Sequence, residues 1–138
     1  MTHEAEAKLI WEAYEAQKNS YAPYSHFRVG AALLAENGRI YRGCNIENAA
    51  YSVSNCAERT AFFKAVSEGV RAFAAIAVVG NTEKEQGDYC PPCGVCRQMM
   101  AEFCGKDFKI LLAKSLTDWK TCTLGELLPE SFSLNDPV

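Results

Sequence analysis

The chain has 138 residues and a mass of 15.2 kDa, which is the size of one domain. Hydrophobic residues make up 49% and charged residues 22%, as in ordinary globular proteins, which excludes a disordered chain. The 14 Lys and Arg residues against 17 Asp and Glu residues give a net charge of −3, which disfavours DNA or RNA polymers as ligands, because phosphate binding needs clustered cations. We therefore expect a single domain over residues 1–138.

Hydrophobic segments and cysteines predict where this protein works. The longest apolar run, residues 72–79, is far shorter than the ~20 residues that cross a bilayer, and the acidic start lacks the positive region of a signal peptide. We expect a cytoplasmic protein that does not bind membranes. Seven cysteines are many for a reducing compartment, and an odd number cannot all be paired within the chain, so metal ligation is the leading explanation.

The first third of the chain predicts a helix followed by a β-hairpin. Hydrophobic residues recur at helical spacing over residues 4–17, with acidic residues opposite them. Residues 27–35 alternate as along one strand, Asn37-Gly38 is a strong two-residue turn, and the alternation resumes over residues 40–44. These two strands are expected to pair with each other.

The remainder alternates helices and strands. Its expected elements are a helix that follows the polar stretch 45–55 and stops at Gly69, a strand over 73–80, a helix over 94–104, strands over 108–113 and 119–122, and a brief capped helix that ends at residue 128. Because βαβ crossovers place helices over a sheet, this order predicts an α/β fold. We expect three layers, α/β/α, around a mixed five-stranded sheet.

Three cysteines occur at the starts of two predicted helices. If the flanking strands form parallel βαβ units, Cys56 at one helix start and Cys93 and Cys96 at the other lie at the same edge of the sheet. Helix N-termini favour thiolates, and Zn²⁺ prefers sulfur and nitrogen ligands arranged in a tetrahedron. The pattern therefore predicts a zinc site with three sulfur ligands.

Cys90 leaves an alternative open. Cys90 and Cys93 also have the CxxC spacing, and a set of four sulfurs would be a closed structural site, as in a zinc module that binds a partner. Glu58 favours a catalytic site, because a carboxylate two residues after Cys56 can shuttle protons beside an open zinc position. A thioredoxin-like redox role for residues 93–96 would leave both Cys56 and Glu58 without a function.

The same residues also resemble a known family. Cys56-Ala57-Glu58, followed by Pro92-Cys93-Gly94-Val95-Cys96, is similar to the zinc-deaminase motif in its three-cysteine form. The similarity extends over most of the chain, which resembles the small homotetrameric cytidine deaminases. The matching segments are residues 22–27, 29–32, 43–49, 56–61 and 127–129.

The resemblance implies a cytidine deaminase-like fold and the hydrolytic deamination of free cytidine and deoxycytidine to uridine and deoxyuridine, within pyrimidine salvage. A zinc-bound hydroxide would attack C4 of cytosine, and Glu58 would carry the proton to N3 and then to the leaving amine. The resemblance also implies one zinc ion per subunit, held by Cys56, Cys93 and Cys96. The subunits would form a homotetramer whose sites lie at subunit interfaces.

Substrate contacts follow from the same resemblance. Asn45 and Glu47 would bind the ribose hydroxyls, since a carboxylate accepts hydrogen bonds from a diol and an amide both donates and accepts them. Phe27 would pack against the pyrimidine ring. The remaining expected contacts are Ala57, Tyr51 and Phe132, with Tyr51 in a segment used between subunits and Phe132 inserted into a neighbouring subunit's site.

Charge adds two expectations. Glu47 beside the ribose would repel a 5′-phosphate, which favours free nucleosides over nucleotides. Three thiolates, a hydroxide and Glu58 carry more negative charge than zinc offsets, so we expect Arg59 to donate hydrogen bonds to one or two zinc-bound sulfurs. The nearest alternative among enzymes is a deaminase of a modified cytosine nucleoside, such as an antibiotic, although residues 45–48 favour a plain ribose.

Overall fold

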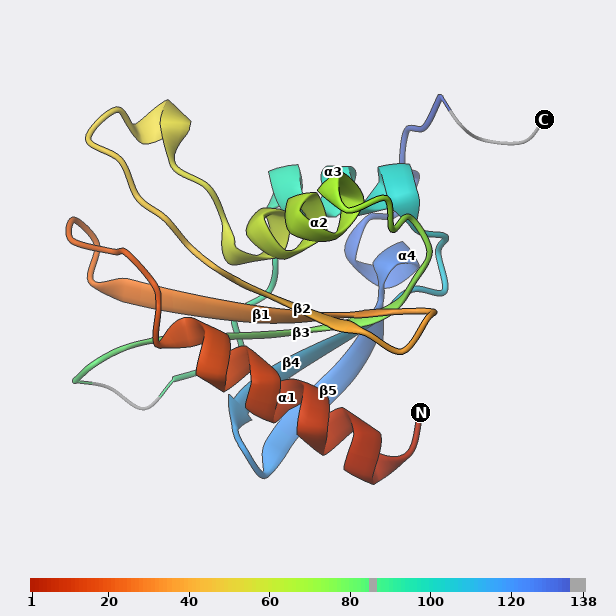
Figure 1. Ribbon diagram of the computed structural model, residues 1–138, viewed down its shortest axis with the longest axis horizontal. Helices are drawn as coiled ribbons and strands as arrows, with labels where there is room; N and C mark the ends of the chain where they lie inside the picture. The colour runs from red at the N-terminus through yellow and green to blue at the C-terminus, as the bar shows by residue number, and fades with distance from the viewer. Residues whose placement is uncertain (85–86, 135–138) are drawn as a thin grey trace.

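A mixed sheet with strand order β2-β1-β3-β4-β5 forms the centre of the molecule. In the computed structural model, which describes residues 1–84 and 87–134, helices cover both faces of this sheet (Figure 1). The predicted three-layer α/β/α arrangement is therefore confirmed. The strands are β1 (Phe27–Ala35), β2 (Ile40–Cys44), β3 (Phe73–Thr82), β4 (Lys109–Ser115) and β5 (Asp118–Thr123).

Helix α1 (His3–Gln17) lies on one face of the sheet, and α2 (Ala57–Ser67), α3 (Gly94–Phe103) and α4 (Leu124–Leu127) lie on the other (Figure 1). Each face has its own hydrophobic core, because successive side chains of a strand point to opposite sides. Ile76 of β3 belongs to the core under α2, whereas its neighbours Ala75 and Ala77 belong to the core under α1. No helix within the described residues is long and apolar enough to cross a membrane.

Strand directions bring the starts of two helices to one edge of the sheet. β1 is antiparallel to both β2 and β3, so β2 and β3 run in the same direction, and β3 is parallel to β4. Helix α2 connects β2 to β3, and α3 connects β3 to β4. Both helices therefore begin at the same edge, as the βαβ interpretation predicts, although β1 lies between β2 and β3.

Element boundaries differ from the expected ones by only a few residues. β3 continues to Thr82, because its last residues pair with the first residues of β1 in the register Phe27↔Thr82. The stretch between β2 and α2 contains a short 3₁₀-helix, η1 (Tyr51–Val53), which has no hydrophobic period by which it could be predicted. The predicted capping box is present, since Thr123 and Glu126 each accept a hydrogen bond from the other's backbone N–H.

Gly43 lets α2 rest directly on β2. A Cβ atom at this position would lie 2.4 Å from the carbonyl oxygen of Ala57 and 2.5 Å from the nitrogen of Ala61, far inside van der Waals contact. Only glycine permits such a close approach of two backbones. The height of α2 above the sheet, and with it the position of the residues at the helix start, depends on this missing side chain.

Candidate metal centre and active site

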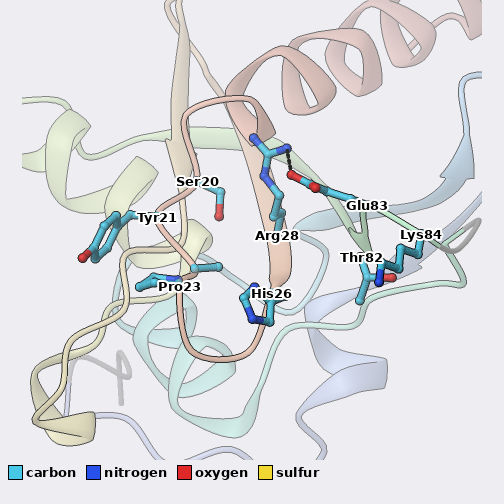
Figure 2. A pocket seen from close by; sticks show the side chains of 9 residues that line it. Ser20, Tyr21, Pro23, His26, Arg28, Thr82, Glu83 and Lys84 are labelled. Atoms are coloured by element: carbon cyan, nitrogen blue, oxygen red, sulfur yellow. Dashed lines mark ion pairs between the residues drawn. The ribbon is translucent and has the colours of Figure 1, made fainter.

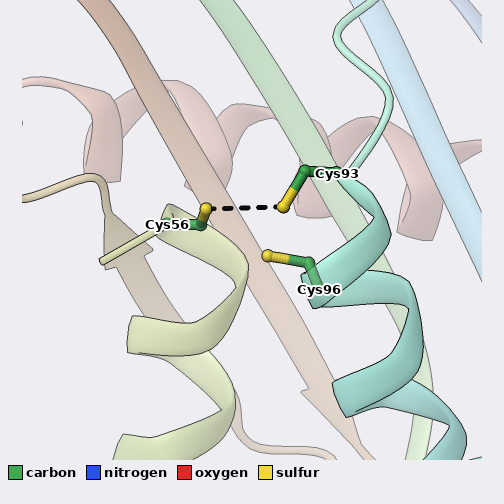
Figure 3. A group of neighbouring side chains, drawn as sticks. All are labelled: Cys56, Cys93 and Cys96. Atoms are coloured by element: carbon green, nitrogen blue, oxygen red, sulfur yellow. Dashed lines mark hydrogen bonds between the residues drawn. The ribbon is translucent and has the colours of Figure 1, made fainter. Parts of the chain in front are cut away.

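The sulfur atoms of Cys56, Cys93 and Cys96 converge at the N-terminal ends of α2 and α3, all within 4.8 Å of one another (Figure 3). Cys56 and Cys93 are the N-cap residues of the two helices, and Cys96 lies in the first turn of α3. The Cys56 and Cys93 sulfurs are 3.7 Å apart. Zn–S bonds of about 2.3 Å give a tetrahedral edge of roughly 3.8 Å, so the three cysteines fit a zinc ion.

Cys90 lies outside this cluster, which contains three sulfurs rather than four. It lies over Gly80 of β3 instead, where an added Cβ would be 2.7 Å from the Cys90 sulfur. Burial, followed by the negative charges of Glu58 and Cys56, raises the pKa of Cys90 to about 12, so its thiol is neutral. The alternative of a closed four-sulfur structural site is therefore not supported.

Hydrogen bonds distribute the charge among the sulfurs. A hydrogen bond from the Cys96 thiol is the main cause that lowers the pKa of Cys56 to about 5, and bonds from Arg59 and Cys93 lower it further. The same bond, followed by burial, raises the pKa of Cys96. Arg59 Nη2 lies 3.3 Å from Cys56 Sγ, so the hydrogen bond from Arg59 to a cluster sulfur expected from the sequence is present.

Glu58 is the buried carboxylate beside the sulfurs. Its side chain is only 4% exposed, and no other charged side chain among the described residues is buried. Burial, with a smaller contribution from the charge of Cys56, raises the pKa of Glu58 to about 7. A carboxyl group that titrates near neutral pH both accepts and donates protons under ordinary conditions, as a general acid–base catalyst must.

A cavity of about 370 Å³ joins the sulfur cluster to the expected substrate residues. Its volume lies within the roughly 300–1,000 Å³ range of small-molecule sites. Eight of the expected site residues line it: Asn45, Glu47, Tyr51, Cys56, Ala57, Glu58, Arg59 and Cys93. Cys96 is fully buried behind this surface.

Asn45 is already engaged by the chain itself. Its Oδ1 accepts hydrogen bonds from the Val29 N–H at 2.9 Å and from the Ser20 hydroxyl, and its Nδ2 donates to the Phe27 carbonyl at 2.8 Å. The carboxamide therefore fixes the start of β1 against the end of β2. Only the second Nδ2 hydrogen remains for a ligand among the described contacts, which restricts the role expected of Asn45 to that of a donor.

Glu47 lies between the sulfur cavity and a second cavity of about 400 Å³, and both are also lined by Tyr51 and Ser54. Its Oε1 accepts hydrogen bonds from the backbone N–H groups of Tyr24 and Ser25 at 3.0 and 3.1 Å, and its Oε2 accepts one from the Ser25 hydroxyl. These bonds, chiefly the one from the hydroxyl, lower the pKa of Glu47. The carboxylate is therefore an anion.

Three aromatic residues expected near the substrate are exposed in the single chain. Phe27 is 39% exposed, Tyr51 77% and Phe132 67%. The ring of Phe27 converges with Cys90 over Gly80, where an added Cβ would lie 2.9 Å from Phe27 Cε1. Phe27 and Phe132 do not line the sulfur cavity, so the structure does not bring these two predicted contacts into the site within one chain.

Sequence reasoning missed a residue that supports the cluster. Arg97 Nε donates to the Pro92 carbonyl, and its Nη1 donates to the Leu127 carbonyl, both at 2.7 Å. Arg97 thereby ties the loop in front of Cys93 to the end of α4. An arginine that follows Cys96 within a helix has no distinguishing pattern, and its two partners are carbonyl oxygens that any residue supplies.

Another cavity, of about 730 Å³, contains none of this chemistry (Figure 2). It is lined by residues 20–23, 26, 28 and 82–84. Arg28 forms an ion pair with Glu83 at 3.6 Å and donates to the carbonyl oxygens of Gln17 and Lys18. The Arg28 guanidinium is therefore already paired with groups of the chain, and no cysteine lines this cavity. The smaller cavity beside the sulfur cluster is the candidate active site.

Known proteins resemble this chain over nearly its whole length. Residues 3–112 match the family model described as the cytidine and deoxycytidylate deaminase zinc-binding region. A curated cytidine deaminase of Sporosarcina psychrophila is 56% identical over 129 residues, which cover 94% of this chain and 92% of the relative. One of Halalkalibacterium halodurans is 52% identical over 128 residues, which cover 93% of this chain and 94% of the relative.

The solved structures similar to this chain include cytidine deaminases, as do its curated relatives. The crystal structure of a cytidine deaminase from Burkholderia pseudomallei has a TM-score of 0.84 and 46% identity, and the match covers 96% of this chain and 100% of that one. The cytidine deaminase from Mycobacterium tuberculosis has a TM-score of 0.79 and 34% identity, with 97% and 100% covered. The family model and the relatives match this chain, and the three-sulfur cluster lies beside a buried carboxylate. The chain therefore belongs to the cytidine and deoxycytidylate deaminase family.

Proposed function

We propose that this protein is a cytoplasmic, zinc-dependent cytidine deaminase of pyrimidine salvage. It hydrolyses the C4 amine of free cytidine and deoxycytidine, so that water is consumed and uridine or deoxyuridine and ammonia are formed. One observation carries the proposal: buried Glu58 and the sulfurs of Cys56 and Cys93 face a single cavity. Two curated relatives, 56% and 52% identical to this chain, are named cytidine deaminases, which supports the same reaction.

Cys56, Cys93 and Cys96 would hold one zinc ion per chain, which when bound supplies a water molecule whose pKa falls to about 7. Glu58 takes up a proton from the attacking water and delivers it to N3 of the cytosine ring. It then takes the proton of the hydroxyl now attached to C4 and passes it to the amine, which leaves as ammonia while the C4 carbonyl forms. Its pKa of about 7 supports this role, because such a carboxyl group takes up and releases a proton near neutral pH without a large change in free energy.

The remaining residues orient the nucleoside. Asn45 donates its second Nδ2 hydrogen to a ribose hydroxyl, and Glu47 accepts a hydrogen bond from one. Phe27 packs against the base. Tyr51 and Phe132 act across subunit interfaces of a homotetramer, and their exposure in the single chain supports contact with other copies. Ala57 completes the wall of the cavity next to the metal.

Charge favours nucleosides over nucleotides. Arg59 is the only Lys or Arg among the described residues that line the two neighbouring cavities, and it is already bonded to Cys56. A 5′-phosphate would therefore meet the Glu47 carboxylate without a free cation to pair with. We expect cytidine and deoxycytidine to be deaminated far faster than deoxycytidylate.

An assay of the purified protein tests the proposal. Cytidine absorbance should fall as ammonia is released, a strong chelator should abolish the reaction, and added Zn²⁺ should restore it. Glu58→Gln should lower kcat by at least ~100-fold with unchanged zinc content, because the proton carrier is lost. Glu68→Gln removes an exposed carboxylate beyond the end of α2 and serves as the control. Absence of ammonia from both nucleosides would overturn the proposal.

A further inference from the structure

The hydroxyl of Ser25 connects two residues to which the proposed function gives substrate contacts. Ser25 Oγ donates a hydrogen bond to Glu47 Oε2 and accepts one from the backbone N–H of Phe27 at 3.0 Å. The backbone N–H groups of Ser25 and Tyr24 donate to the other carboxylate oxygen, Oε1. Three donors from two consecutive residues therefore hold the Glu47 carboxylate.

His26 makes this arrangement possible. Its φ of 59° lies in the left-handed region, which non-glycine residues rarely adopt, although histidine is among those that tolerate it. The backbone N–H of His26 donates to the Ala22 carbonyl at 3.0 Å and closes the turn. The chain reverses at His26, so that the Ser25 hydroxyl reaches both the N–H of Phe27 and the carboxylate of Glu47.

The turn is also bonded to the backbone next to Glu47. The N–H of Tyr21 donates to the Asn45 carbonyl at 3.0 Å, and the N–H of Glu47 donates to the Tyr21 carbonyl at 2.8 Å. Residues 21–27 and 45–47 therefore form one hydrogen-bonded unit. A carboxylate held in advance in one orientation loses no rotational freedom when a ligand binds, and this raises the affinity for the ligand.

We propose that Ser25 is a positioning residue that aims the Glu47 carboxylate at a sugar hydroxyl of the substrate. The proposal rests on the proposed function, because it takes Glu47 as the group that binds the sugar. A carboxylate has about four lone-pair sites, and the chain fills three of those on Glu47, so one is left for a ligand. Without the Ser25 hydroxyl, only the two backbone N–H groups on Oε1 still hold the carboxylate, so Oε2 is less firmly oriented and its bond to the sugar weakens.

Steady-state kinetics with cytidine test this role. Ser25→Ala should raise KM about tenfold, the size expected for one hydrogen bond to a charged group, while kcat changes less than about threefold. Ser25→Thr keeps a hydroxyl and should recover most of the lost affinity. Ser67→Ala removes an exposed serine hydroxyl that is bonded to the Lys64 carbonyl, and it controls for general effects on the fold.

A double mutant separates positioning from structural damage. In a Glu47→Gln background the carboxylate is already absent, so Ser25→Ala should raise KM by less than about twofold more. An equal tenfold effect in both backgrounds would overturn the proposal, since Ser25 would then act independently of Glu47. A loss of kcat as large as the rise in KM would overturn it as well.

Amide hydrogen exchange gives a readout that needs no substrate. Ser25→Ala should speed exchange at the Phe27 amide, and Glu47→Ala should speed exchange at the Tyr24 and Ser25 amides, because each loses its acceptor. Unchanged exchange in both variants would overturn the positioning role. If the wild-type protein releases no ammonia from cytidine, the proposed function fails, and the exchange rates still decide whether Ser25 and Glu47 form one unit.

Discussion

Arg59 and Cys56 lie one helical turn apart, and the Nη2 atom of Arg59 is 3.3 Å from the Cys56 sulfur. This hydrogen bond is the main cause that raises the pKa of Arg59, so the guanidinium is permanently cationic beside the sulfurs. We propose that a fixed cation at this place would offset the excess negative charge of three thiolates and would keep a bound zinc ion electron-poor enough to activate water.

Arg59→Gln should lower kcat by about 10- to 100-fold, because outer-shell partners of metal ligands typically contribute that much to activity. Zinc content should stay at the wild-type level, since all three sulfurs remain. Turnover assays and metal analysis of the same preparation measure both quantities. Arg42→Gln is the matched control, because Arg42 forms an ion pair with Glu12 away from the sulfurs. Wild-type turnover in Arg59→Gln would contradict the role assigned to this residue.

Cys90→Ala should leave the zinc site unchanged, because the Cys90 sulfur lies outside the cluster. X-ray absorption should find three sulfur ligands in both the wild-type protein and the variant. Cys93→Ala, which removes a cluster sulfur, should lose most of its zinc and serves as the comparison. A fall from four sulfurs to three in Cys90→Ala would revive the closed structural site.

Gly43→Ala should destabilise the fold by about 1–3 kcal/mol, the usual cost of overpacking, because the new methyl group collides with the backbone of α2. The start of α2 carries Cys56 and Glu58, so zinc affinity should fall together with stability. Urea unfolding and a chelator competition measure the two effects. Gly105→Ala adds a methyl group where no atom lies within 4 Å, and we expect it to be neutral.

His26→Val should cost about 1–2 kcal/mol of stability, because a β-branched side chain is strongly strained at a φ of 59°. His26→Asn should cost much less, since asparagine tolerates the left-handed region. Thermal unfolding compares the two variants. Equal stability of both would show that the turn adapts to any side chain, and the geometry around Ser25 would then not depend on residue 26.

Most of the fold follows from local patterns. Alternation in residues 27–44, the Asn37-Gly38 turn and the capping box at Thr123 each predict an element that the structure contains. The insertion of β1 between β2 and β3 could not be predicted in the same way, because strand order depends on contacts between distant segments. The close approach at Gly43 also has no local pattern, since an isolated glycine within a strand has several possible reasons.

Some residues of the candidate site could be predicted from the sequence, and others could not. Cys56, Glu58, Cys93 and Cys96 could be found because their spacing and their places at helix starts carry the chemistry. The internal hydrogen bonds of Asn45 could not be found, because they go to the backbone of β1. The same holds for Arg97, whose partners are two carbonyl oxygens from other segments. Side chains that bind backbone atoms of distant segments are visible only in the folded chain.

The two helix starts that supply the sulfurs have a consequence for how the protein matures. Cys56 and Cys93 are 37 positions apart, and all of α2 and β3 must form between them before their sulfurs meet. A growing polypeptide therefore presents isolated thiols, and a complete set of three exists only after α3 has docked on the sheet. Because zinc would then bind the native state far better than the unfolded one, we expect metal uptake to be the final step of assembly and to make assembly harder to reverse.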